Sequence, residues 1–215
     1  MSHDNFLQVT ISGKKIEIYT HSYLGLGLKA ARTAIFTQGN TANAIDNNAN
    51  NSEVIKLTSP CMATSKPQPW SYGGSNYLIS GPRKKPTYKK CLNVVRKVLK
   101  AKKVHVPVEL QHHNVAVFSS FYDCAIDSGI LPAGATKGST KVKSFIKAAK
   151  KACYKNVPKT AGFLCVDLTY IVGLLMDGYG LKPEKEIQIF KKIDGHEVSW
   201  ALGVAYSLSG GNFVI

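Results

Sequence analysis

Alternating apolar and polar residues predict a β-hairpin at the start of the chain. The alternation runs over Gln8–Ile11 and again over Ile16–Tyr19, and Ser12-Gly13-Lys14 separates the two runs. Two alternating runs around a short turn that contains glycine are typical of a hairpin. A helix is expected next, because apolar residues recur at helical spacing at Leu24, Leu28, Ala31 and Ile35.

Two polar segments follow, and neither keeps the period of a helix. Residues 39–52 hold six asparagines and few apolar residues, which predicts an exposed and mobile loop. Residues 66–86 are rich in proline and glycine around a predicted strand at 76–80. We expect this second segment to be a surface excursion rather than a linker between domains.

The rest of the chain shows the periods of four helices, a strand and a final helix. Apolar residues keep helical spacing over 88–101, 118–130, 141–153 and 167–176. Residues 187–193 alternate as a strand, and Ser199 can cap a last helix that runs through Leu208. The pattern shows no internal repeat and no clear boundary, so it indicates one mixed α/β domain.

The charge of the chain is strongly positive and unevenly placed. The 28 Lys and Arg outnumber the 13 Asp and Glu, which gives a formal net charge of +15. Ten basic residues lie between Arg83 and Lys103 and eight between Lys137 and Lys159, with no acidic residue in either window. Such a field favours an anionic partner. In each window the apolar residues lie on one face of a predicted helix. We therefore expect the lysines to lie on the opposite, solvated faces of amphipathic helices.

Several classes of protein are not expected from the composition. Hydrophobic residues make up 44% of the chain, which suits one globular core. No run approaches the roughly 20 apolar residues of a membrane span, and the first eight residues lack the pattern of a signal peptide. Too few aromatic residues are interleaved with the lysines for a nucleic-acid site. No nucleic-acid partner and no membrane segment are therefore expected in this chain.

Residue types alone show no complete catalytic constellation. Gly25-Leu26-Gly27 lies between a strand and a helix but lacks the third glycine of a dinucleotide loop. His105, His112 and His113 have no Asp or Glu at ligand spacing. No direct protein ligand for a metal is therefore expected.

The five cysteines leave two interpretations open. They are too widely scattered for a CxxC-type site, so they are either five reduced core thiols or two disulfides with one thiol left over. Asn50-Asn51-Ser52 forms a sequon that makes Asn50 a candidate for N-glycosylation. The sequon agrees with secretion but occurs often by chance.

Three stretches together resemble the apyrase family, the nucleoside tri- and diphosphate diphosphohydrolases. They are Tyr19–Leu28 followed by Ala30-Ala31-Arg32, then Cys165–Ile171, then Lys192–Gly203, in the order and at about the spacing of the family. The forms YLGLGL and CxDLTY are most similar to the soluble, secretory-pathway branch, which prefers nucleoside diphosphates such as UDP and GDP. The resemblance extends from about Ile16 to Leu208.

The resemblance implies an α/β fold, an actin-like and ribonuclease-H-like lobe with a mixed sheet and flanking helices, incomplete at its N-terminus. In the family, two such lobes close over a nucleotide with a divalent cation, Ca or Mg. Residues 1–215 are expected to be the C-terminal lobe alone, with residues from about 199 to 215 carrying the final motif back toward the missing N-terminal lobe. The phosphate-binding turns and the glutamate that activates water have no match here, so this chain alone is expected to be inactive.

The implied activity of the complete enzyme is hydrolysis of a nucleoside diphosphate to the monophosphate and phosphate. This chain would contribute the nucleobase-binding side, in the lumen of the endoplasmic reticulum or Golgi, or after secretion. One alternative is a catalytically inactive protein that binds nucleotides. A less favoured alternative is a basic module that binds nucleic acid.

One pair of nucleobase contacts is implied by a helix of the FSxFY type. Phe118–Asp123 matches this helix, so Phe121 and Tyr122 are candidates to stack on the base. Core packing is an equal alternative for each ring.

A second pair is implied by Met176–Gly180, which matches another base-contacting segment of the family. Asp177 and Tyr179 are its candidates. Cell-surface members often present an arginine where this chain has Asp177. A carboxylate cannot stack as a guanidinium does, but it can accept hydrogen bonds from guanine or uracil.

The resemblance also implies roles for the last motif and for the cysteines. Trp200 and Ser199 are candidates for the water shell of the metal, and Trp200 has packing between the lobes as its alternative. The family branch places disulfides where this chain has Cys61 with Cys91 and Cys153 with Cys165. Cys124 is then the unpaired cysteine.

Overall fold

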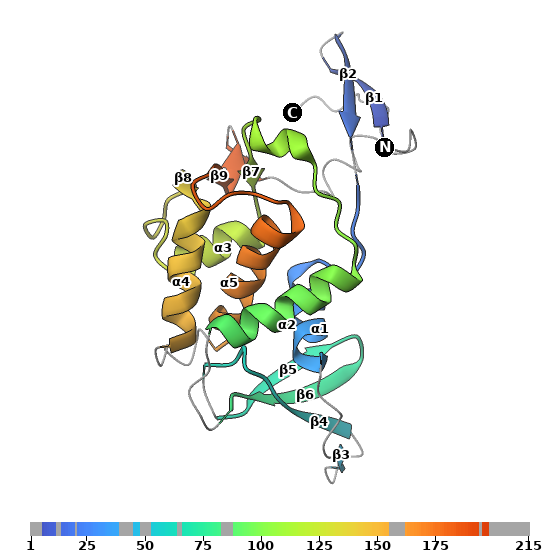
Figure 1. The fold of residues 1–215 in the computed structure, drawn as a ribbon, viewed down its shortest axis with the longest axis vertical. Coiled ribbons are helices and arrows are strands. Elements are labelled where there is room, and N and C mark those ends of the chain that lie inside the picture. The colour runs from blue at the N-terminus through green and yellow to red at the C-terminus, as the bar shows by residue number, and fades with distance from the viewer. Residues whose placement is uncertain are drawn as a thin grey trace.

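The structure is a computed structural model, and it describes residues 6–11, 14–19, 21–38, 45–47, 53–63, 66–82, 88–154, 162–193 and 195–197. Within these ranges it is a mixed α/β protein, with helices between separate sheets (Figure 1). None of the described helices is long and apolar enough to cross a membrane. In chain order the elements are β1 (Phe6–Ile11), β2 (Lys14–Tyr19), α1 (Leu28–Thr37), β3 (Ile45–Asn47), β4 (Glu53–Thr58), β5 (Gln68–Tyr72), β6 (Ser75–Ser80), α2 (Tyr88–Ala101), η2 (Val108–Gln111), β7 (Ala116–Val117), α3 (Ser120–Asp127), β8 (Lys137–Lys141), α4 (Val142–Tyr154), α5 (Leu164–Gly173), η4 (Leu174–Gly178), β9 (Glu186–Phe190), β10 (Lys192–Ile193) and β11 (His196–Glu197).

The described strands form two mixed sheets and two separate hairpins rather than the one mixed sheet expected. The larger sheet has the order β3-β4-β6-β5, in which β4 and β6 are parallel and the outer pairs are antiparallel. The smaller sheet has the order β7-β9-β8, with β7 parallel and β8 antiparallel to β9. The helices lie between these two sheets (Figure 1), which keeps their strands apart.

The opening hairpin is confirmed, and β1 pairs antiparallel with β2 along all six residues of each strand. It lies at the opposite end of the molecule from the larger sheet (Figure 1). The hairpin β5–β6 turns at Gly73 and Gly74, whose φ angles of 61° and 81° are the left-handed values that a two-residue turn between twisted strands needs. Glycine adopts these values without strain.

The asparagine-rich segment is not entirely a loop. Within the predicted loop 39–52, residues Ile45–Asn47 form β3 and pair antiparallel with Glu53–Ile55 of β4. Pairing with β4 gives these backbone groups hydrogen-bond partners despite the polar sequence. The other residues of the segment, including the candidate glycosylation site Asn50, lie outside the described residues.

The four helices of the central region are confirmed, with changes at their ends. α2 has the predicted bounds, and α4 differs from its prediction by one residue at each end. α3 covers less than the predicted 118–130, because Ser119 has a φ of 55° before it and Gly129 a φ of 73° after it. The helix expected at 167–176 starts earlier, as α5, and continues as the π-helical turn η4. The predicted last helix lies outside the described residues.

α5 is the central helix of the core. Every residue of this helix is buried, and it contacts α1, α2, α3 and α4. Gly173 at its end allows α2 to approach closely, since a Cβ there would lie 2.5 Å from the Cγ1 of Val95. A helix that is buried on all sides organises the core around itself.

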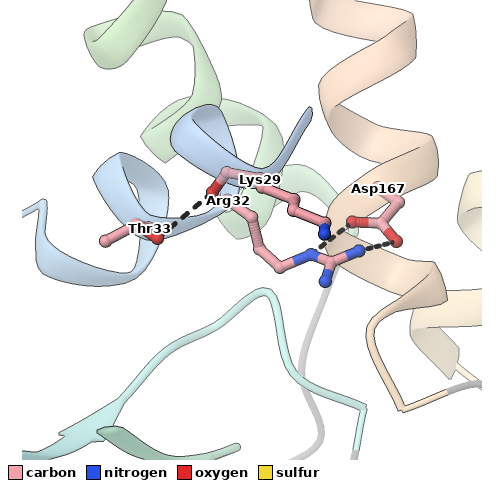
Figure 2. A network of polar contacts seen from close by, with 4 residues as sticks. All are labelled: Lys29, Arg32, Thr33 and Asp167. Carbon is pink, nitrogen blue, oxygen red and sulfur yellow. Dashed lines mark hydrogen bonds and ion pairs between the residues drawn. The ribbon is translucent and has the colours of Figure 1, made fainter. Parts of the chain in front are cut away.

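An ion pair, which we call the clasp, joins α1 to α5. Arg32 donates from Nε to Oδ1 of Asp167 at 2.9 Å and from Nη2 to Oδ2 at 2.7 Å (Figure 2). The two side chains are only 12% and 10% exposed. Two parallel N–H···O bonds fix both groups in one plane, which is the strongest geometry for an Arg–carboxylate pair. The clasp therefore holds the first and second stretches of the resemblance together.

Aromatic rings enclose the clasp. The guanidinium carbon of Arg32 lies 4.5 Å from the ring centroid of Trp70 and 4.6 Å from that of Phe163. Trp70 donates its indole N–H to Thr33 Oγ1 at 2.8 Å, which ties the larger sheet to α1. Burial raises the pKa of Asp167, and its hydrogen bonds from Arg32 offset only part of that effect.

The structure joins the same cysteine pairs that the resemblance implies. Cys61 is bonded to Cys91, 30 residues later, and Cys153 to Cys165, 12 residues later. Cys124 is free and buried. Burial raises the pKa of its thiol, and the nearby carboxylate of Asp167 raises it further. A protonated thiol in the core is a poor nucleophile.

We predict that Asp167→Asn lowers the free energy of unfolding by about 3–5 kcal/mol, because it leaves the Arg32 guanidinium buried without a counter-charge. The measurement is urea denaturation followed by circular dichroism. Arg32→Met with Asp167→Leu removes both charges and should lose much less. A matched control is Asp177→Asn in the half-exposed pair with Arg96, where we expect a change of at most about 1 kcal/mol. A double variant as unstable as Asp167→Asn would contradict the prediction.

We predict that Cys153→Ser with Cys165→Ser lowers the free energy of unfolding by about 3 kcal/mol. Cys61→Ser with Cys91→Ser should lower it slightly more, because the bridge between Cys61 and Cys91 closes a longer loop.

Mass spectrometry after treatment with iodoacetamide should show no labelling of any cysteine in the native protein. One label, on Cys124, should appear after unfolding without reductant. Rapid labelling of Cys124 in the native state would disagree with the buried thiol.

Candidate functional site

A cavity of about 410 Å³ lies where the C-terminal half of α2 meets η4. Asp177, one of the candidates for nucleobase contact, is among its lining residues. The others come mostly from α2 and the turn that follows it. The lining consists of Arg96, Leu99, Lys100, Lys103, Val104, Asp177 and Gly178.

The cavity carries a guanidinium beside a carboxylate. Arg96 donates from Nε toward both carboxylate oxygens of Asp177, at 3.1 Å and 3.0 Å. The two side chains are 49% and 33% exposed, so water screens the pair and it adds little to stability. The Nη groups of Arg96 make no hydrogen bond or ion pair with another described residue, and they remain available as donors.

Lys103 reaches the cavity from a strained position. Its φ of 48° lies in the left-handed region, which costs about 1–2 kcal/mol for a residue with a Cβ. Glycine is the usual residue where a helix ends this way. A lysine in this place keeps an ammonium group at the cavity, and strain of this kind is typical of functional positions.

Local sequence explains how the lining residues reach the cavity. The apolar face of α2 is buried, including Val95, Val98 and Leu99, and this leaves Arg96 and Lys100 on the opposite face, one turn apart. In η4 the N–H of Tyr179 bonds to the carbonyl of Leu174 at 2.8 Å. This i→i+5 bond is that of a π-helical turn, a feature often found at functional sites.

Tyr179 lies at the other side of this turn, close to the first stretch of the resemblance. It is half-buried, and its pKa is raised by burial and by the neighbouring Tyr23. Tyr23 accepts a hydrogen bond from the N–H of His105 at 2.8 Å. Tyr170, from the second stretch, donates its hydroxyl to the carbonyl of Leu26. The segment that precedes α1 therefore lies close to the segments that follow α2 and η4.

The two candidates on α3 differ in exposure. Tyr122 is 9% exposed, and its hydroxyl donates to the carbonyl of Ala135 at 2.8 Å. The ammonium of Lys191 lies 5.9 Å from the centroid of the Tyr122 ring. Phe121 is only partly buried and packs at the edge of the core. Of the two rings, Phe121 has more surface free for a ligand.

The candidate residues do not form a single cluster. Across the described ranges, no hydrogen bond, ion pair or ring contact joins Phe121 or Tyr122 to Asp177 or Tyr179. The remaining candidates, Trp200 and Ser199, lie outside the described residues. Among the candidates that the structure describes, Asp177 alone lines the cavity.

A metal ion finds no ready set of protein ligands in this region. No group of three or more His, Cys, Asp or Glu side chains that could hold a metal occurs among the described residues. His112 and His113 are exposed. The described residues therefore do not fit direct coordination of a divalent cation.

Three lining residues were missed by the sequence analysis. Lys100 and Lys103 were expected to belong to solvated faces of helices and Arg96 was not singled out, whereas the structure places all three around a cavity. One signal was present in the sequence. Arg96 is the single arginine among the lysines of α2, and arginine is preferred where a planar pair with a carboxylate is required.

Comparison with known proteins finds relatives among the nucleoside phosphatases, the family that the sequence motifs resemble. Ectonucleoside triphosphate diphosphohydrolase 5 of Gallus gallus is 34% identical over 195 residues, which cover 89% of this chain and 43% of that protein. Nucleoside diphosphate phosphatase ENTPD5 of Homo sapiens is 34% identical over 199 residues, with the same shares covered. Ectonucleoside triphosphate diphosphohydrolase 6 of Mus musculus is 37% identical over 194 residues, which cover 88% of this chain and 40% of that protein.

The chain thus spans less than half the length of these relatives. A model of one family of nucleoside phosphatases matches residues 1–212, almost the whole chain. This match agrees with the resemblance and with the mixed α/β structure. The chain belongs to the GDA1/CD39 (nucleoside phosphatase) family.

Proposed function

We propose that this chain is the C-terminal lobe of a nucleoside diphosphatase, with the actin-like fold of that lobe, and that it supplies the nucleobase-binding side of the active site. The complete enzyme would convert a nucleoside diphosphate such as UDP or GDP to the monophosphate and phosphate. Membership of the nucleoside phosphatase family supports the reaction class. A human relative is named a nucleoside diphosphate phosphatase, which supports the substrate class.

The observation that carries the proposal is the cavity at Asp177. Its guanidinium and carboxylate offer a hydrogen-bond donor beside an acceptor. Guanine presents O6 as an acceptor, and arginine is its commonest partner. The adjacent ring N–H of guanine, or that of uracil next to O4, can donate to Asp177, because an ionised carboxylate has about four acceptor sites and Arg96 occupies only some of them.

The positive charge of the cavity suits the rest of the ligand. Lys100 and Lys103 are both exposed and line the same space. With Arg96 they outnumber the one lining carboxylate by three to one. Such a surface attracts an anionic nucleotide and raises its local concentration.

We also propose which aromatic residues stack on the base and which residues lie near the divalent cation. Phe121 is the better-exposed candidate to stack on the base, with Tyr122 as its alternative and Tyr179 as a further ring near the cavity. Trp200 and Ser199 would lie near the water shell of the divalent cation, Ca or Mg. The cation would neutralise phosphate charge in the complete enzyme. We place that enzyme in the secretory pathway or outside the cell, consistent with the two disulfides.

We predict that Asp177→Asn and Arg96→Gln each weaken binding of UDP and GDP to this chain about 10- to 100-fold, because each leaves a polar edge of the base without its partner. Binding is measured by isothermal titration calorimetry. Asp123→Asn, which removes an exposed carboxylate from α3, is the matched control and should bind as the wild type does. Equal binding by all four proteins would show that the base lies elsewhere.

We predict that these 215 residues release no phosphate from UDP or GDP, and that supplying the first lobe of the human relative upstream creates activity. In the rebuilt enzyme, Phe121→Ala should raise KM about 10- to 100-fold and leave kcat nearly unchanged. The reason is that base stacking is worth about 1–3 kcal/mol and the base is remote from the scissile bond.

Trp200→Ala should instead lower kcat more than it raises KM, because Trp200 is proposed to lie near the water shell of the cation. Nucleotide binding with no turnover in the rebuilt enzyme would favour a catalytically inactive binding protein.

A further inference from the structure

The exposed face of α4 carries a row of lysines that the proposed nucleotide site does not use. Lys143, Lys147 and Lys151 follow one another at intervals of four residues, and Lys150 lies beside them. Residues four apart in a helix share a face and are about 6 Å apart along its axis. We call these four residues the lysine row.

Repulsion within the lysine row, and Lys143 at the start of the helix, work against the stability of α4, although Lys151 in its last turn is favourably placed. Like charges four residues apart repel each other. The first turn of α4 contains no acidic residue and includes Lys143, although the N-terminus of a helix favours negative charge. Glu184, which is 66% exposed, lies 2.8 Å from Lys143 and is the only acidic residue that pairs with the row across the described ranges. Most of the row therefore lacks an acidic partner within the part of the chain that the structure describes.

The lysine row also continues toward a second helix. The ammonium of Lys150 lies 5.9 Å from the ring centroid of Tyr88, the first residue of α2. Lys89 follows in the first turn of α2 and is exposed. The first turn of α2 likewise contains no acidic residue. The positive surface thus spans the junction of two helices and is longer than one turn, which suits an extended polyanion.

We propose that the lysine row binds a sulfated polysaccharide. Closely spaced sulfate groups supply the negative charge that the row lacks, and their charge does not depend on pH. The disulfide between Cys153 and Cys165 anchors the end of α4 to the start of α5, so the lysines stand on a rigid element. Disulfides persist in oxidising compartments and outside cells, where sulfated polysaccharides also occur.

Two other polyanions fit the lysine row less well. RNA recognition uses several aromatic rings interleaved with the cations, whereas α4 carries one exposed ring, Tyr154, which follows the last lysine of the row. A helix that binds a membrane surface inserts an apolar face. The apolar face of α4, which includes Phe145, Ala149 and Ala152, is buried in the core.

The test compares two variants of the chain that lose the same charge. In the first, Lys147, Lys150 and Lys151 of the row are changed to Gln. In the control, the exposed residues Lys15, Lys29 and Lys192 are changed to Gln. Binding of a heparin oligosaccharide is measured by titration calorimetry between 50 and 200 mM NaCl, and folding is checked by circular dichroism.

We expect the first variant to bind heparin at least about tenfold more weakly than the wild type, with a salt slope lower by about three, one for each lysine lost. The control should lose less than about threefold. Changing the same three residues of the row to Arg keeps the charge and should keep the affinity. The Arg variant therefore shows whether weaker heparin binding by the Gln variant comes from the lost charge or from a disturbed fold.

Three outcomes would overturn the proposal. Equal losses in the two Gln variants would mean that heparin responds to net charge alone. Tighter binding of a single-stranded RNA than of heparin at the same salt concentration would assign the row to nucleic acid. Tighter binding of phosphatidylserine vesicles would assign it to a membrane surface. None of these outcomes depends on whether the cavity at Asp177 binds a nucleotide.

Discussion

The buried pairing of Arg32 with Asp167 is the constraint on which the arrangement of the other elements depends. Asp167 lies in α5, the helix that every other described α-helix contacts, and Arg32 is the point at which α1 is held to it. Because both charges are almost fully removed from water, neither can be satisfied in another position. The pair therefore sets the position of α1, and through Trp70 that of the larger sheet, relative to the core.

The cavity at Asp177 is built differently from this clasp. Its ion pair is half-exposed and contributes little to stability, so its geometry can respond to a ligand. Rigidity comes instead from the buried faces of α2 and of α5 with its continuation η4, which present Arg96 and Asp177 to each other. Binding sites for small molecules are usually built on rigid elements of this kind.

Local features of the fold could be predicted from sequence patterns, whereas contacts between distant residues could not, apart from the two disulfides that the resemblance implied. The opening hairpin and the helices follow from periodicity, which acts over a few residues. Arg96 and Asp177 are 81 residues apart and Arg32 and Asp167 are 135 apart, so no local pattern shows that either pair meets. The resemblance indicated Asp177 as a site residue but not its partner. Similarly, β3 forms in an asparagine-rich segment because β4 supplies its hydrogen bonds, which sequence propensity does not register.

The absence of a side chain at Gly173 has a consequence for how this site can change. Val95, the residue that a Cβ at position 173 would meet, immediately precedes Arg96. One added methyl group on α5 would therefore push α2 outward and carry the Arg96 guanidinium away from Asp177. The width of the cavity can thus be altered from inside the core, by a substitution that touches no ligand. Relatives could diverge in the shape of this cavity in this way while every residue that lines it stays the same.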